Sequence, residues 1–158
     1  MSLLIWNVRG FNKKGRSKDV MDHFHKHSPS VLALVETQVK SAKVMRLNGC
    51  VHHWWSCHHF HLSRRGRIWI AWGTSIWTCF PVSVSLQQIT LYVTNRGGLE
   101  GHLTIVYGEN THGQREQLWK EHTELQITNL PWIVLGDLNT ARYTDKKVGG
   151  KVLSFCSA

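Results

Sequence analysis

The sequence predicts an α/β (α+β) fold in which a βαβ unit opens the chain and antiparallel strands follow. The first observation is the order strand, helix, strand, with apolar runs at Leu3–Trp6 and Val31–Val35 on either side of a helical segment. The second is a middle region whose runs are rich in Ile, Val, Thr and Trp and are separated by turn residues. We expect these runs to form an antiparallel meander, at residues 67–72, 76–80, 86–94 and 102–107.

The βαβ unit is expected to contain a helix over residues 18–27. Ser17 is the expected N-cap, and Ser28-Pro29 ends the helix because a residue before proline avoids helical backbone. The apolar side chains of this helix share one face, at Val20, Met21 and Phe24. The apolar run after it is continuous, which is typical of a strand buried on both faces.

Three further elements are expected along the chain. A short helix is predicted at 41–47, and a polar helix is predicted at Gln114–Ile127. A buried strand then begins at Pro131 and ends at Asp137. Asn139 lies two residues further on and would point to the same side as Asp137 on an extended chain.

The length and charge of the chain limit its number of domains and the kinds of partner it can bind. We expect its 158 residues to form one domain, or part of one, with 42% hydrophobic residues for a core. The net charge of +9 favours a nucleic-acid partner, DNA or RNA, although a merely solvated basic face is the alternative. No apolar run approaches the roughly 20 residues that span a bilayer, so no membrane partner is predicted. Four irregularly spaced cysteines indicate reduced thiols, and we expect an intracellular, nuclear protein.

Polar side chains end four of the predicted strands. Asn7 ends the first strand, Glu36 the second and Tyr107 the last strand of the meander, with Asn110 three residues beyond; Asp137 and Asn139 follow the final strand. If these ends share one edge, the site holds carboxylates, amides and a phenol. That set suits a hard divalent cation and a phosphate.

Each of these residues also has an ordinary structural explanation. A single Asn after a strand is usually a turn residue, a single Glu is usually solvated, and a single Tyr is usually half-buried. Two polar side chains close together at the end of an apolar strand are harder to explain by turn formation alone. The occurrence of polar residues at all four strand ends favours a functional site.

Four segments of the chain resemble motifs of the endonuclease/exonuclease/phosphatase superfamily, which includes deoxyribonuclease-I-like and apurinic/apyrimidinic endonucleases. The motif sequences are most similar to the endonuclease domain of plant non-LTR retrotransposons, and the resemblance extends over residues 2 to about 150. The segments are Trp6-Asn7-Val8-Arg9-Gly10, Glu36-Thr37, Tyr107-Gly108-Glu109-Asn110 and Gly136-Asp137-Leu138-Asn139, supported by Gly66-Arg67-Ile68-Trp69.

The resemblance implies a four-layer α/β sandwich of two mixed β-sheets flanked by helices. It also implies cleavage of a phosphodiester bond in DNA that depends on Mg²⁺, or on Mn²⁺ in its place. Glu36 would ligate the metal, Asn7 would support that carboxylate, and Asp137 would orient or activate the attacking water. The phosphate would be contacted by Tyr107 and Asn139, with Asn110 nearby.

The chain departs from the family pattern at its C-terminal side. Family members continue to a Ser-Asp-His motif, whereas this sequence has no Asp after Asp145 and no His after His122. We therefore expect residues 1–158 to be a partial, C-terminally incomplete domain whose full-length relatives carry a reverse-transcriptase region. The expectation is weak or absent nuclease activity; the alternatives are a non-catalytic nucleic-acid-binding remnant and a decayed product without a selected role.

Two further groups of residues invite a functional interpretation. The Cys- and His-rich segment 50–61 suggests zinc, but its Cys spacing favours a loop under weak selection, or adventitious metal uptake, instead. Trp54-Trp55 in that segment could stack on bases, although core packing or a place in a strand is the commoner fate.

Phosphate contacts are expected from basic residues of the first loop (Arg9, Lys13, Lys14 and Arg16). A second loop is expected to add Arg64, Arg65 and Arg67 to the same phosphate-tracking surface, with a merely solvated face as the alternative.

Overall fold

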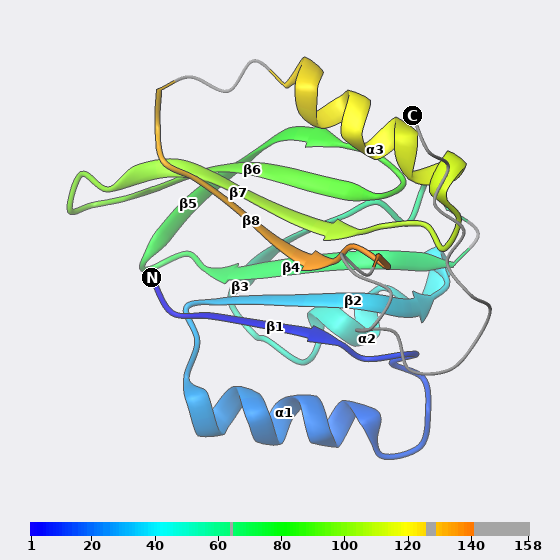
Figure 1. Ribbon diagram of the computed structural model, residues 1–158. Helices are drawn as coiled ribbons and strands as arrows, with labels where there is room; N and C mark the ends of the chain where they lie inside the picture. Colours follow the sequence, from blue (N-terminus) through cyan, green and yellow to red (C-terminus); the bar gives the residue numbers. More distant parts are fainter. Residues whose placement is uncertain (64, 126–128, 141–158) are drawn as a thin grey trace.

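Two four-stranded mixed sheets pack face to face, with α1 (Arg16–His27) outside one sheet and α3 (His112–Glu124) outside the other (Figure 1). This computed structural model describes residues 1–63, 65–125 and 129–140. The arrangement confirms the predicted α/β sandwich. The other elements are β1 (Leu3–Asn7), β2 (Val31–Val39), η1 (Ser41–Lys43), α2 (Met45–Asn48), β3 (Trp54–His58), β4 (Gly66–Gly73), β5 (Trp77–Val84), β6 (Gln88–Asn95), β7 (Glu100–Tyr107) and β8 (Trp132–Asp137).

The first sheet contains the predicted βαβ unit. Its strand order is β1-β2-β4-β3, and β1 runs parallel to β2 with Asn7 opposite Val35. The helix between them begins at Arg16, because Gly15 takes the N-cap position in a left-handed conformation without a side-chain cap. The prediction that Ser17 caps this helix is therefore wrong, while the stop before Pro29 is confirmed.

Strand β2 is longer than predicted. Its first five residues are buried, as a strand covered on both faces requires. The strand then continues through Glu36 to Val39 with a register shift against β4. Glu36 and Gln38 both have a φ of +54° in this shifted stretch. The irregularity turns the chain around Glu36 instead of ending the strand there.

The second sheet holds only part of the predicted meander. Strands β5, β6 and β7 are antiparallel neighbours, and β8 adds to β7 in parallel. The run at 67–72 does not belong to the meander, because β4 pairs with β2 and β3 in the first sheet. Its continuous apolar run at 68–72 fits either sheet, so the sequence pattern alone could not show that the chain crosses over at Gly73–Ile76.

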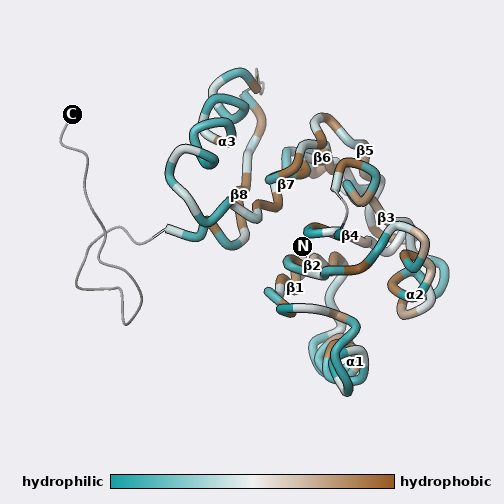
Figure 2. Tube along the Cα trace, turned by 90° about the vertical axis from the view of Figure 1, so that its right-hand side faces the viewer, coloured by the Kyte–Doolittle hydropathy of each residue, from teal (hydrophilic) through white to brown (hydrophobic). Residues whose placement is uncertain are grey.

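Two apolar cores hold the layers together. The core between the sheets includes Ala33, Ile70, Leu91 and Ile105. The core under α1 includes Val20, Leu34 and Trp69, with Phe24 at its edge. In Figure 2, α3 is mostly hydrophilic along its length, so it contributes little apolar surface beyond the buried Leu118. No helix within the described ranges is both long and apolar enough to cross a membrane.

The segment at 50–61 forms a strand where a loop was expected. In β3, Trp54 packs against Phe24 with ring centroids 5.1 Å apart, while Trp55 is 67% exposed. Core packing is therefore confirmed for Trp54 alone. The predicted short helix near 41–47 divides into η1 and α2, and α3 begins and ends earlier than predicted. Residues 126–127 of that predicted helix lie outside the described residues.

Strand β8 is an exposed edge strand, which corrects the prediction of a buried one. Ile133 is 44% exposed and Val134 is 40% exposed. β7 is its only hydrogen-bonded neighbour in the described part of the chain. The indole of Trp132 donates a hydrogen bond of 2.8 Å to Thr104 of β7. An apolar run therefore identified the strand, but it could not identify the strand's neighbours.

Gly136 permits the closest approach of β8 to β7. Its φ is +145°, and a Cβ built there would lie 1.9 Å from the carbonyl oxygen of Val106. We predict that Gly136→Ala lowers the free energy of unfolding by about 2–4 kcal/mol, because backbone must move apart. Chemical denaturation would measure it. Gly113→Ala, in open space on α3, should change stability by about 1 kcal/mol or less; equal losses in both variants would contradict the prediction.

Candidate functional site

The predicted strand ends meet at one edge of the two sheets. Asn7 ends β1 opposite Val35, and Tyr107 ends β7 opposite Asp137. The amide nitrogen of Asn7 donates a hydrogen bond of 2.8 Å to Oδ2 of Asp137, which joins the two sheets. A cavity of about 130 Å³ lies at this junction, lined by Ile5, Asn7, Val35, Gly136 and Asp137. The predicted convergence of these strand ends is confirmed.

A turn, and not an extended strand, brings Asp137 and Asn139 together. Asn139 has a φ of +48°, and its backbone N–H donates to Oδ1 of Asp137 at 2.9 Å. Its side-chain amide donates to the carbonyl oxygen of Gly108 at 2.6 Å. Both oxygens of Asp137 therefore accept one hydrogen bond each. Each oxygen retains a second lone pair for a further donor.

Glu36 lies on the wall of a neighbouring, larger cavity. Its Oε1 accepts a hydrogen bond of 3.1 Å from the side chain of Gln38. The cavity measures about 570 Å³, and Tyr107 and Asn110 also line it. Gln38, which the sequence interpretation missed, shares the shifted stretch of β2 with Glu36. Residues two apart in a strand point to the same face, and that spacing was the available signal.

The Tyr107 hydroxyl is held in its protonated form. Burial raises its pKa, and the nearby carboxylates of Glu36 and Asp137 raise it further. A hydrogen bond from Asn139 and the charge of Arg67 act in the opposite direction without reversing the shift. Tyr107 is therefore a neutral hydrogen-bond donor at physiological pH, suited to an anionic oxygen.

Three charged side chains complete the surroundings of the site. Arg67 of β4 pairs with Glu109, and its guanidinium lies 5.8 Å from the ring centroid of Tyr107. Arg115 of α3 donates to the carbonyl oxygens of Glu109 and Asn139, at 2.7 and 3.0 Å. Sequence interpretation missed Glu109 and Arg115. Glu109 stands between two predicted site residues, whereas no pattern distinguished Arg115 within its polar helix.

The backbone of the first loop is hydrogen-bonded to Glu36, since Gly10 N–H donates to its carbonyl oxygen at 2.8 Å, but the basic side chains of the loop do not line the Glu36 cavity. The backbone N–H of Arg9 donates to Oδ1 of Asn7 at 3.1 Å, while its side chain is exposed. Lys13 and Lys14 line a separate cavity of about 560 Å³ together with Arg46. Arg16 lies over the ring of Trp6, 5.6 Å from its centroid, and pairs with Asp19. Of the four basic residues predicted in the first loop, only Arg9 touches the site, and it does so through its backbone. Arg65 and Arg67 of the second predicted group line the Glu36 cavity, and Arg64 lies outside the described residues.

The histidines and cysteines of 50–61 have separate environments. The Cys50 thiol donates to the carbonyl of Arg46, and His58 stacks on Phe60. His59 is fully buried, and its Nε2 accepts the backbone N–H of Arg67 at 3.1 Å. Burial, followed by the charge of Arg67, lowers the pKa of His59 to about 4. Within residues 1–63, 65–125 and 129–140, no three His, Cys, Asp or Glu side chains gather as a metal site.

The donor set at the sheet edge nevertheless fits a magnesium ion. Mg²⁺ keeps several waters and takes one or two carboxylates together with substrate phosphate, so it does not require three protein ligands. Glu36 offers a half-buried carboxylate oxygen at the cavity wall. Asn7 offers an amide oxygen at the adjacent junction. Oxygen donors without thiolate or imidazole favour a hard cation over zinc.

The fold and this site correspond to a known family. Residues 4–146 match the Endonuclease/Exonuclease/phosphatase family. The chain therefore belongs to that family, which by its name comprises nucleases and phosphatases. No curated protein matches the sequence.

Solved structures share the fold at low sequence identity. The endonuclease domain of TRAS1, a telomere-specific non-LTR retrotransposon, has a TM-score of 0.67 at 14% identity, over 89% of this chain and 61% of its own. A humanized TDP2 of D. rerio has 0.66 at 18% identity, over 90% and 67% respectively. The human Nocturnin catalytic domain has 0.60 at 12% identity, over 89% and 65%. The chain thus spans about two thirds of the length of these structures or less.

The buried His59 generates a prediction about pH. Its folded pKa of about 4 lies below the unfolded value near 6.5, so the unfolded state binds the extra proton between these values. Its contribution to stability is complete above pH 6.5 and is lost as the pH falls toward 4, by up to about 3 kcal/mol. His59→Gln should flatten the stability–pH curve in this window, as measured by urea unfolding. His52→Gln, at an exposed position, should retain the wild-type slope; identical curves for all three proteins would refute this assignment.

Proposed function

We propose that this chain is a metal-dependent phosphodiesterase domain of the endonuclease type that acts on DNA. The observation that carries the proposal is the hydrogen bond between Asn7 and Asp137. It joins the ends of two parallel strand pairs, so that Glu36, Tyr107 and Asn139 come to the same edge. Carboxylates, amides and a neutral phenol together can hold a cation, a phosphate and a water.

Glu36 would hold Mg²⁺, or Mn²⁺ in its place, and Asn7 would support it. When bound, the cation supplies Lewis acidity that stabilises negative charge on the phosphate. The hydrogen bond from Gln38 restricts the Glu36 side chain to the cavity wall. An oriented carboxylate loses less conformational entropy when it binds an ion.

Tyr107 and Asn139 would bind the scissile phosphate. Burial keeps the Tyr107 phenol protonated, so its O–H can donate to a phosphate oxygen. Asn139 donates one amide hydrogen to the carbonyl of Gly108 and hydrogen-bonds the Tyr107 hydroxyl, so it would turn its second amide hydrogen from that hydroxyl to the phosphate. Asn110 lines the same cavity as Tyr107 and offers another amide.

Asp137 would orient the attacking water. Its two oxygens are fixed by the Asn7 amide and by the Asn139 backbone N–H, at 2.8 and 2.9 Å. The remaining lone pairs can accept a hydrogen from water and direct that water's oxygen toward the phosphate. A carboxylate held from two sides keeps its orientation during the reaction.

DNA is the proposed partner, with RNA as the alternative. D. rerio TDP2 has been crystallised with a single strand DNA product, at 19% identity and a TM-score of 0.65 to this chain. The net charge of +9 supports a polyanionic partner. The likeness to the TRAS1 domain is consistent with an origin in a retrotransposon. A parent protein with a reverse-transcriptase region and a nuclear location belong to this proposal without support from the solved structures. The particular similarity to plant elements belongs to the same proposal.

We expect cleavage by these 158 residues to be slow. The Ser-Asp-His motif of the family does not occur in their sequence. The last histidine, His122, lies on α3 with its ring 5.5 Å from that of Trp132, which is itself at the start of β8 and not at the site. Loss of one member of a catalytic group commonly costs several orders of magnitude in rate. A domain that binds DNA and cuts it poorly is the second candidate function, and the basic cavity of Lys13, Lys14 and Arg46 favours it.

Carboxylate substitutions test the proposed chemistry. We predict slow, Mg²⁺-dependent nicking of supercoiled plasmid that EDTA abolishes and that Glu36→Gln or Asp137→Asn lowers at least about 100-fold. Asp22→Asn removes an exposed carboxylate from α1 and should nick at the wild-type rate. Gel electrophoresis of time courses measures the rates. Nicking that survives in Glu36→Gln would exclude the proposed metal site.

Salt dependence tests the binding function separately. In EDTA, duplex DNA should bind with an affinity that falls steeply with salt and is unchanged by Asp137→Asn. Replacing both Lys13 and Lys14 by Gln should reduce the slope of log K against log salt by about 2, since each lost phosphate contact contributes about 0.9. Fluorescence anisotropy measures this slope. An unchanged slope would remove the basic first loop from the DNA interface.

A further inference from the structure

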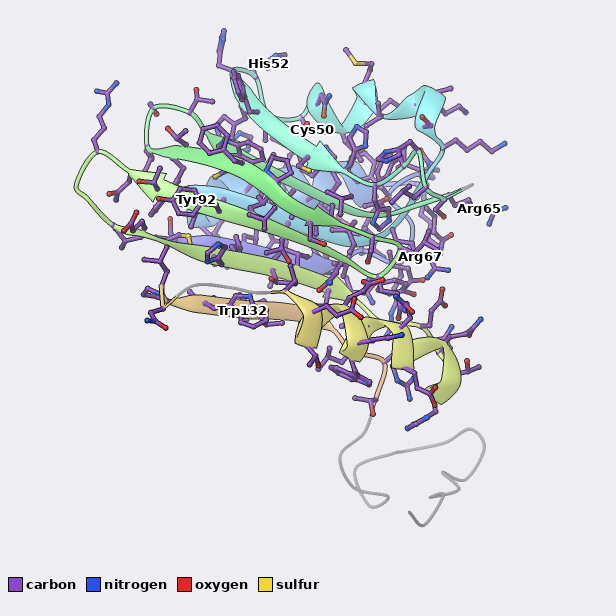
Figure 3. The ribbon with its side chains drawn as sticks, turned by 90° about the horizontal axis from the view of Figure 1, so that it is seen from above. Cys50, His52, Arg65, Arg67, Tyr92 and Trp132 are labelled. Atoms are coloured by element: carbon purple, nitrogen blue, oxygen red, sulfur yellow. The ribbon has the colours of Figure 1, made fainter. Side chains whose placement is uncertain are left out.

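Arg67 belongs to the first sheet, but its side chain reaches the second. It pairs with Glu109, just beyond the end of β7, and its guanidinium lies 5.8 Å from the ring centroid of Tyr107. The side chains of Arg67 and Glu109 are 29% and 21% exposed, so the pair is largely shielded from water. Figure 3 shows Arg67 and Arg65 at the same end of the molecule, with Trp132 farther along.

Both members of the pair are fixed by further contacts. The backbone N–H of Arg67 donates to the buried His59. The backbone N–H of Glu109 donates to the side chain of Gln87 at 2.7 Å, and Arg115 binds the Glu109 carbonyl oxygen. The guanidinium is therefore directed at one place on the Tyr107 ring. A general surface ion pair would lack this support.

We propose that Arg67, held by Glu109, is a positioning residue that fixes the Tyr107 phenol where it meets the substrate phosphate. The planar guanidinium covers one face of the ring, and its attraction to the ring restricts the rotation of the side chain. Glu109 offsets the charge of Arg67 and holds its guanidinium through one nitrogen–oxygen contact. This inference rests on the proposed function for the role of Tyr107, but not for the contact itself.

The rival interpretation is a salt bridge that only joins the two sheets. Such a pair would affect stability but not the contribution of Tyr107 to phosphate binding. A second rival is a general charge effect in the cavity. Arg65 lines the same cavity and is exposed, and it makes no ion pair or ring contact within the described residues. Arg65 is therefore the matched control for charge without contact.

A double-mutant cycle separates these possibilities. The probe is a short single-stranded phosphorothioate DNA in EDTA buffer, so the readout is affinity and not catalysis. Arg67→Gln and Tyr107→Phe should each weaken binding about tenfold, and the double variant should be no weaker than either single one. Arg67→Lys should not restore the affinity, because an ammonium lacks the planar face. Arg65→Gln should weaken binding by a factor that multiplies with that of Tyr107→Phe.

Urea unfolding of each variant gives the structural control. If Arg67→Gln does not fold, the Arg67→Gln/Glu109→Gln pair, which leaves no unpaired charge, takes its place in the same cycle. The proposal is overturned if the losses in affinity for Arg67→Gln and Tyr107→Phe multiply, or if Arg67→Lys restores full affinity. It is also overturned if Arg65 is coupled to Tyr107 as strongly as Arg67 is, or if the parent chain has no measurable affinity. If Arg67 and Tyr107 are coupled in a protein that never nicks plasmid, the positioning role of Arg67 is supported and the proposed catalytic function is refuted.

Discussion

Asn7 and Asp137 lie in different sheets, and their side chains can meet only because both parallel strand pairs end at the same edge. The apolar core between the sheets sets the distance over which this hydrogen bond must form. Parallel pairing then places Val35 beside Asn7 and Tyr107 beside Asp137. The site is thus a product of sheet register, and any slip of one strand would separate its members.

The charges around the edge are compensated unequally. Glu109 has the guanidinium of Arg67, and Asp137 has two N–H donors. Glu36 has the neutral amide of Gln38, and no ion pair reaches it within the described ranges. A carboxylate with no cationic partner at a cavity wall has the most to gain from an added cation. Burial, and then the charge of that carboxylate, also raise the pKa of the nearby Tyr107 phenol above its ordinary value, so the phenol is still less ready to ionise.

The sequence predicted the parts of this structure that depend on local chemistry. Apolar runs located nearly every strand, and polar residues after them located Asn7, Glu36, Tyr107 and Asp137. Pairing between distant segments was less accessible: β4 is an apolar run like those of the meander strands but joins the other sheet. The contacts of Arg67 with Glu109 were hidden for the same reason, because they connect residues 42 apart. Gly15 at the N-cap shows that backbone geometry can replace an expected Ser cap.

The exposed position of β8 has a consequence for motion. Within the described residues, Asp137 and Asn139 are attached to a strand with one hydrogen-bonded neighbour, and single side chains connect them to the first sheet and to α3. Edge segments of this kind detach in local opening events that cost much less than global unfolding. Hydrogen exchange would then be faster for β8 amides than for β6. The site would then assemble and come apart many times while both cores stay intact. A nucleic-acid strand bound at the site would be the main factor that keeps β8 in place.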